Sequence, residues 1–304
     1  MRTKFILFVL LLTGISGFAQ QDAQYTQYMY NTININPAYA GSRGVMSIFG
    51  LHRTQWVGLE GAPVTNAVSL NTPINNSNLG LGLSFVNDRI GPADENSISA
   101  DFSYTINTSE TFKLSFGLKA TAHLLNVDFN KLNIYDHSDS RFQNNIDNKF
   151  SPNFGAGIYL HSDKTYVGVS VPNFLETKHY DKSSASTAKE NLHYYVIAGH
   201  VFEINPDIKF KPALLTKIVK GAPLQVDLSA NFLLYDKFTA GLAYRWDAAC
   251  SAMVGFQITN GLFAGYAYDM ETTKLADYNS GSHEIFLRFE LFNRSNRILT
   301  PRFF

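Results

Sequence analysis

The chain has 304 residues, 25 of them basic and 25 acidic, so its formal net charge is zero and gives no electrostatic reason to expect a nucleic-acid partner. Charged residues make up only 16% of the chain, against about 25% in soluble domains, while aromatic residues reach 14%. Because its mean hydropathy of -0.10 is too polar for a bundle of membrane helices, the composition favours a sheet with one apolar and one polar face, as in a membrane β-barrel or a secreted β-sandwich.

Residues 1–19 have the three parts of a secretory signal peptide. A short basic start is followed by an apolar core at residues 5–12 and by a small-x-small cleavage site, Gly17-Phe18-Ala19. The apolar run is too short for a transmembrane helix, so we expect export and cleavage after Ala19. The residue directly after that site is Gln20 and not a cysteine, which argues against a lipid anchor. Cys250 is the single cysteine of the sequence, so no disulfide can form within the chain.

Residues 20–43 do not have the alternation of a strand. They are rich in Gln, Tyr and Asn and end in Asn36-Pro37-Ala38-Tyr39-Ala40-Gly41. We expect either an ordered periplasmic segment or a plug in the mouth of a barrel.

From residue 44 onward the dominant sequence period is two, which indicates β-strands. In residues 112–122, for example, apolar side chains from Phe112 to Ala122 alternate with polar or small ones that include Lys113 and Lys119. None of the apolar series contains a charge, as expected where lipid covers one face, because a Lys or Arg near the bilayer midplane costs about 2–4 kcal/mol. The strands run to roughly 9–11 residues, the length that crosses a membrane, whereas strands of a soluble sandwich are usually about 5–6 residues long.

The sequence predicts fourteen strands, an even number as in bacterial single-chain barrels, at residues 44–53, 64–72, 79–88, 96–106, 111–123, 152–161, 164–173, 192–202, 207–217, 223–234, 237–247, 250–259, 261–270 and 282–292.

We number the connections between these strands in chain order, from the one after the first strand. The long connections, above all residues 124–151 and 174–191, have odd numbers, and the connections with even numbers are short. Barrels of the outer membrane have short periplasmic turns and longer extracellular loops, so we predict an all-β, transmembrane, antiparallel up-and-down barrel over residues 44–292. Residues 293–304 then form a periplasmic C-terminal tail. Pro212 fits poorly inside a paired strand, and a β-bulge there would accommodate it.

Motifs that carry chemistry are missing from the sequence. The eight histidines have no metal-ligand spacing, and there is no nucleophile elbow and no phosphate-binding loop. Acidic residues within 136–147 could bind a divalent cation, but their spacing matches no calcium loop. We therefore expect no enzyme activity, no catalytic residues, no cofactor and no metal.

The charges that alternate with the apolar series point into the predicted lumen. Two interpretations stay open for them: pairs that stabilise a narrow barrel, or a selectivity filter. The lumen-facing candidates are Lys113, Lys119, Arg245, Glu284, Arg288 and Glu290.

Several runs of residues resemble one known family. They are Gln24-Tyr25-Thr26-Gln27-Tyr28-Met29-Tyr30-Asn31 with the Asn36–Gly41 run, Arg53-Thr54-Gln55-Trp56-Val57-Gly58-Leu59-Glu60-Gly61-Ala62-Pro63, Val86-Asn87-Asp88-Arg89-Ile90-Gly91-Pro92, Gly221-Ala222-Pro223-Leu224, Asp227-Leu228-Ser229-Ala230-Asn231, Gly281-Ser282-His283-Glu284-Ile285 and Pro301-Arg302-Phe303-Phe304. The mature chain thus resembles the PorP/SprF proteins over nearly its whole length. Its last residues depart slightly from the family's Ser-Pro-Arg-Tyr-Phe. Residues 124–151 and 174–191 resemble the family least.

This resemblance implies an outer-membrane component of the Bacteroidota type IX secretion system, often linked to gliding motility. It implies as partners a large secreted adhesin or effector protein, the periplasmic ring and lipoproteins of the secretion machine, and outer-membrane lipids. Aromatic side chains are natural anchors for such contacts, and packing onto the barrel itself is the open alternative. The candidate partner-binding residues are Tyr28, Tyr30, Asn36, Pro37, Tyr39, Arg53 and Trp56.

Three other function classes remain as alternatives. A passive porin or small-molecule transporter is the nearest, and would have an open, charge-lined pore. A barrel enzyme such as a lipase would need a catalytic pair on one lumen face, and the sequence offers none. A soluble β-sandwich would leave the mature chain water-soluble after export.

Overall fold

A computed structural model describes residues 28–75, 77–132, 145–175 and 191–291. The predicted signal peptide and the predicted tail at 293–304 lie outside these residues. Within them, no helix is long and apolar enough to cross a bilayer.

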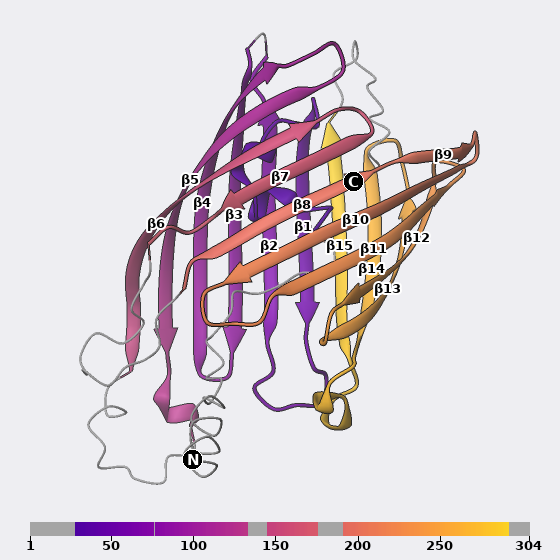
Figure 1. Cartoon of the computed structure of the whole chain (residues 1–304). Coiled ribbons are helices and arrows are strands. Elements are labelled where there is room, and N and C mark those ends of the chain that lie inside the picture. The colour runs from indigo at the N-terminus through magenta and orange to yellow at the C-terminus, as the bar shows by residue number, and fades with distance from the viewer. Residues whose placement is uncertain (1–27, 76, 133–144, 176–190, 292–304) are drawn as a thin grey trace, which may run out of the picture.

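The described chain forms one antiparallel sheet that closes on itself (Figure 1). Its strands are β1 (Met46–Thr54), β2 (Val64–Pro73), β3 (Leu79–Ile90), β4 (Ala93–Asn107), β5 (Lys113–Val127), β6 (Ile146–His161), β7 (Thr165–Val171), β8 (His193–His200), β9 (Phe202–Asn205), β10 (Ile208–Val219), β11 (Gln225–Leu234), β12 (Phe238–Arg245), β13 (Ala249–Gln257), β14 (Leu262–Glu271) and β15 (Ser282–Leu291). Four short 3-10 helices accompany them: η1 (Thr32–Asn34), η2 (Pro37–Tyr39), η3 (Phe129–Lys131) and η4 (Lys274–Tyr278).

Closure of the sheet makes a fourteen-stranded barrel. Each strand pairs with its sequence neighbour, and β1 pairs with both β2 and β15. The short β9 does not count as a separate strand of the barrel. Strands β8 and β9 both pair with β10, on the same side, and together form one strand that is interrupted at Val201. The predicted fold class and strand number are therefore confirmed. The long connections share one end of the barrel, which the predicted topology places outside the cell.

The predicted bounds are wrong in one region, where the barrel wall is taller than expected. Strands β4, β5 and β6 have 15, 15 and 16 residues, so the connection expected at residues 89–95 is only a turn at 91–92. At the loop expected at 124–151, β5 continues to Val127 and β6 begins already at Ile146. Leu125, Val127 and Phe129 form a small buried cluster in this extension.

Pro212 sits in β10 without a bulge at its own position. It pairs with Ala230 of β11, but on its other side the pairing with β8 begins only at Ala213 and the pairing with β9 ends at Phe210. Val201, at which the neighbouring strand is interrupted, donates its N–H to the carbonyl of Lys164, at 2.9 Å. The missing N–H of the proline thus falls where the neighbouring strand is interrupted.

The outward side chains are those of the predicted apolar series. They are exposed along the middle of the strands, for example Leu118 at 63% and Leu242 at 69%. Exposed apolar surface on this scale is rare in water-soluble monomers and is expected of a sheet surrounded by lipid.

At the extracellular end the outward face turns polar. His52, Asn66, Asn87 and Asn96 stand side by side on β1 to β4 in register. Their side chains form a row of hydrogen bonds, including His52 to Asn66 at 2.8 Å and Asn87 to Asn96 at 3.1 Å. Because uncharged polar groups prefer water to hydrocarbon, this row marks the outer edge of the apolar band.

Candidate functional site

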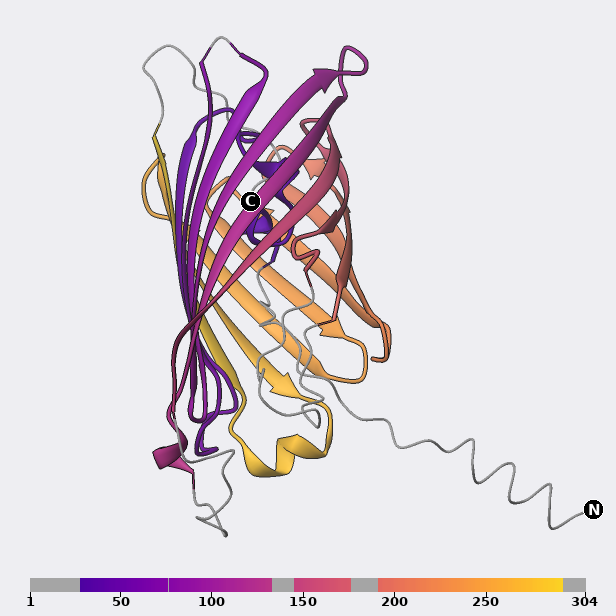
Figure 2. The same cartoon turned by 90° about the vertical axis from the view of Figure 1, so that its left-hand side faces the viewer.

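The lumen is occupied by residues 28–43, which we call the plug. They lie inside the barrel, in the half nearer its short turns (Figure 2). The segment turns tightly because Asn36 caps η2: its side-chain oxygen accepts from the N–H of Ala38 at 3.0 Å, and Pro37 occupies the first helical position. Most of the plug residues are buried, and the others are half-buried.

Hydrogen bonds from the barrel wall satisfy the plug's backbone. Lys119 donates to the carbonyls of both Ile33 and Asn34 at 3.2 Å. Ser103 donates to the carbonyl of Ala40 and Ser170 to that of Ile35, both at 2.7 Å. Plug side chains bond to the wall as well: Asn31 accepts from Ser69 at 2.8 Å, and the Asn36 amide donates to the carbonyl of Ile158 at 3.1 Å. A buried carbonyl left without a donor would cost about 1–3 kcal/mol, so these side chains hold the plug in one place.

Lumen-facing glycines make room for the plug. A Cβ atom on Gly117 of β5 would collide with the backbone of Pro37 and Ala38, and one on Gly80 of β3 would collide with the carbonyl of Ala40. These glycines lie on the polar face that the sequence predicted for the lumen, where any larger side chain would push the plug away from the wall.

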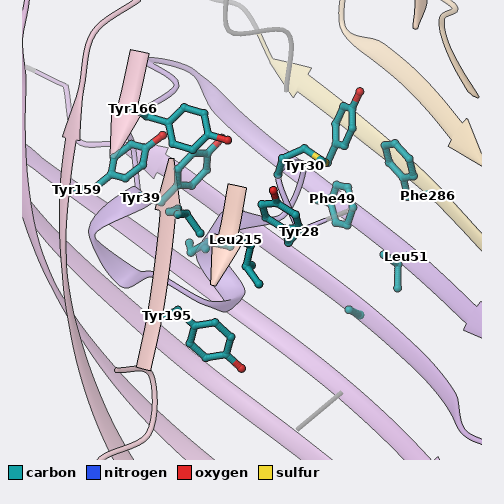
Figure 3. Packing of buried hydrophobic residues seen from close by; sticks show 14 of the residues in the cluster. Tyr28, Tyr30, Tyr39, Phe49, Leu51, Tyr159, Tyr166, Tyr195, Leu215 and Phe286 are labelled. Carbon is teal, nitrogen blue, oxygen red and sulfur yellow. The ribbon is translucent and has the colours of Figure 1, made fainter. Parts of the chain in front are cut away.

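Aromatic rings fill the rest of the interface between plug and wall (Figure 3). Tyr30 stacks on Phe263 with ring centroids 5.4 Å apart and packs against Phe286 at 4.7 Å. On the other side, Tyr39 meets Tyr159 edge to face at 5.6 Å. Such pairs contribute about 0.5–1.5 kcal/mol each beyond the area they bury.

Charged side chains in the lumen occur mainly as ion pairs. Arg53 contacts both Asp269, at 2.7 Å, and Glu284, at 3.0 Å, and all three are nearly fully buried. Lys119 lies 3.4 Å from Asp101. Arg245 lies 3.0 Å from Asp227. Near the periplasmic end, Arg43 and Glu290 form a further pair, and Arg288 lies 3.6 Å from the same carboxylate.

The predicted partner-binding residues lie mostly inside the barrel. Tyr28, Tyr30, Asn36, Pro37, Tyr39 and Arg53 are buried. Their aromatic side chains pack onto the barrel, which was the open alternative, and partner binding by these residues stays a prediction. Trp56 is half-buried at the extracellular end and donates its ring N–H to Glu271 at 2.8 Å.

The predicted lumen-facing charges are placed as follows. Lys119, Arg245, Glu284, Arg288 and Glu290 lie in the lumen, whereas Lys113 is exposed at the periplasmic rim, at the first position of β5. Sequence reasoning missed Arg43, Lys211, Lys217 and Asp269, all of which point inward and are buried. Alternation in residues 208–211 did signal Lys211, but the adjacent proline obscured the pattern.

The arrangement of the described lumen residues is suited to holding a plug. Within the described residues, no group of three or more His, Cys, Asp and Glu side chains is placed to hold a metal ion. The polar contacts described above join two residues of the barrel wall, or a residue of the wall and one of the plug.

Comparison with known proteins identifies the chain. A sequence profile of the type IX secretion system membrane protein PorP/SprF matches residues 17–289. The chain belongs to the PorP/SprF family. No curated protein matches this PorP/SprF chain closely enough to count as a relative.

Solved structures similar to this PorP/SprF chain are distant. The CymD monoaromatic hydrocarbon channel has 14% identity and a TM-score of 0.48, covering 92% of this chain and 96% of its own. A TodX deltaS2S3 mutant monoaromatic hydrocarbon channel has 8% identity and a TM-score of 0.49, covering 88% and 94%. The KdgM porin has 10% identity and a TM-score of 0.38, covering 81% and 99%. At this distance they carry no information on what this barrel binds or conducts. The assignment of this chain as a barrel comes from its own strand pairing.

Proposed function

We propose that this PorP/SprF barrel supports the secretion or surface attachment of a large adhesin or effector by the type IX system, through protein–protein contacts at its two ends. The observation that carries the proposal is the plug: a lumen filled by buried side chains and bonded backbone is suited to a docking component and poorly suited to a conduit. Family membership supplies the secretion system as the context.

The two ends of the barrel offer different surfaces for such contacts. The tall wall of β4, β5 and β6, with η3 and η4, stands at the extracellular end (Figure 1), and we assign the adhesin or effector to it. The short turns at the opposite end face the periplasm, and we assign the periplasmic ring and lipoproteins of the machine to them. Export by the predicted signal peptide and a role in gliding motility belong to the same proposal.

Deletion of the gene tests this function. We expect surface display of a large adhesin to fall, and motility with it, while uptake of small solutes stays normal; re-expression of the unaltered chain restores display. Normal display and motility in the deletion strain would contradict the proposal.

A pull-down from solubilised outer membranes tests the partners. With the intact barrel as bait, we expect mass spectrometry to identify an adhesin or effector together with secretion-system lipoproteins. An unrelated outer-membrane barrel, solubilised and captured in the same way, is the control, and an identical protein set on both baits would contradict the assignment.

A further inference from the structure

Four uncharged polar side chains cross the outer face of β1 to β4 at the extracellular end, and we call them the polar row. They are His52, Asn66, Asn87 and Asn96, which are partners of one another in the strand register. Hydrogen bonds join them from end to end: His52 to Asn66 at 2.8 Å, Asn66 to Asn87 at 3.4 Å and Asn87 to Asn96 at 3.1 Å. His52 and Asn66 are exposed and the other two are half-buried, so the row forms an ordered polar surface.

Aromatic rings extend this surface onto β15 and β14. The hydroxyl of Thr54 lies 3.2 Å from the His52 ring, and Thr54 is the register partner of His283. The hydroxyl of Tyr266 lies 2.6 Å from Nδ1 of His283, and the Tyr268 ring centroid lies 5.2 Å from that of His283. The polar row therefore continues into rings that combine an apolar face with a polar edge.

The charge of this surface fits an uncharged partner. The polar row contains no Lys or Arg, whereas sites for phosphate groups use their cationic donors. At the β4 end, Asp94 accepts from Asn87 at 2.8 Å and from Asn96 at 3.3 Å. Its register partner is Arg89, of opposite charge, which is exposed. The two charges balance, so nothing in the row favours an anion.

The amides of the row keep hydrogen-bonding capacity for a ligand. A carboxamide has two N–H donors and two acceptor lone pairs. In the bonds among the described residues, Asn66 and Asn96 each use one donor and one acceptor site. The bonds within the row fix the orientation of these amides, and their unused donors and acceptors are the groups that sugar hydroxyls, which both donate and accept, can bind.

An apolar row runs beside the polar row on the same face, two residues nearer the middle of the strands. It consists of Val68, Phe85 and Ile98, which are also register partners of one another. Their exposed fractions are 52%, 42% and 53%. A molecule with acyl chains and an uncharged polar headgroup would contact both rows at once.

We propose that this face of β1 to β4 binds a glycolipid of the outer leaflet through its saccharide headgroup. The sugar hydroxyls bond to the polar row, the rings of Tyr266 and Tyr268 border the headgroup, and the acyl chains lie along the apolar row. The partner is a lipid and not a soluble sugar, because the polar row is continuous with the lipid-covered face of the barrel. The inference concerns the membrane contact and is independent of the proposed role in secretion.

A lipid titration of the purified full-length chain in detergent tests this site. The probe is monoglucosyl diacylglycerol, and the controls are phosphatidylcholine and phosphatidylglycerol with the same acyl chains. We expect the unfolding temperature to rise saturably with the glycolipid, beyond its rise with either phospholipid. Equal effects of the three lipids, or a larger effect of phosphatidylglycerol, would overturn the proposal. Free glucose should give no rise, and a rise equal to that with the glycolipid would exclude a lipid as the ligand.

Variants of the polar row assign the effect to this face. We expect Asn66→Ala combined with Asn87→Ala to weaken glycolipid binding about tenfold, the size of about two neutral hydrogen bonds, and Asn66→Ala alone to weaken it about threefold. Asn107→Ala removes an exposed amide at the periplasmic end of β4 and should keep full affinity. Native mass spectrometry measures the dissociation constants. Unchanged affinity of the double variant, or an equal loss in Asn107→Ala, would contradict the assignment.

Discussion

The backbone of Ala38 in the plug lies directly against Gly117 of β5, so closely that Gly117 has no room for a Cβ atom. Two segments about eighty residues apart in the sequence therefore fit together only because the wall position is glycine. The position of the plug in the lumen therefore depends on the identity of this one wall residue.

Substitution of Gly117 by alanine is the smallest change that tests this contact. We expect Gly117→Ala to shift the plug and to lower the free energy of unfolding by about 1–3 kcal/mol, the usual cost of overpacking. Gly50→Ala is the matched control, since a Cβ on Gly50 meets no atom within 4 Å. Urea unfolding in lipid vesicles measures both. Equal stabilities of the two variants would show that the plug does not rest on Gly117.

Lys119 serves both the wall and the plug, and a pair of variants separates these roles. Lys119→Met leaves Asp101 buried without its cation and removes two hydrogen bonds to plug carbonyls, so we expect a loss of about 3–5 kcal/mol. The double variant Lys119→Met with Asp101→Asn removes the unpaired charge and should recover part of that loss, but not the plug contacts. A double variant as stable as the unaltered chain would mean that those contacts contribute nothing.

Arg53 lies between two buried carboxylates, so its removal should be severe. We expect Arg53→Met to lower the free energy of unfolding by about 3–5 kcal/mol, because the buried carboxylates of Asp269 and Glu284 then lose their ion pairs with Arg53. Glu203→Gln breaks the exposed pair with Lys164 and should change it by less than about 1 kcal/mol. Similar effects of the two substitutions, measured by urea unfolding, would argue against a dry lumen around Arg53.

The apolar band predicts where an arginine is tolerated on the outer face. Leu242 is 69% exposed in the middle of β12, so Leu242→Arg should cost about 2–4 kcal/mol in a bilayer. His52 lies in the polar row at the extracellular end, and His52→Arg should cost about 0–1 kcal/mol. Folding yields in lipid vesicles and urea unfolding compare the two. Equal costs would mean that hydrocarbon does not cover the outward face at Leu242.

The strands and their faces could be predicted from the sequence because lipid excludes charge from one face of each strand. The extension of β4 to β6 could not, because residues such as Asp94, Asn126 and Asn148 stand beyond the apolar band, where both faces of a strand can be polar. Such a stretch is indistinguishable from a loop by alternation alone.

The site was predictable only in part. A plug was one of two expectations for residues 20–43, but its contacts depend on spatial neighbours that no local pattern reveals. Gly117 looks like any small residue on a polar face until Ala38 is placed against it.

The most direct test of the plugged lumen is the ionic conductance of the purified chain in planar bilayers. With the plug held by Lys119, Ser103, Ser170 and the aromatic cluster around Tyr30, we predict insertion without a steady open-channel current. A stable, open conductance of the unaltered chain, like that of a porin, would contradict the account.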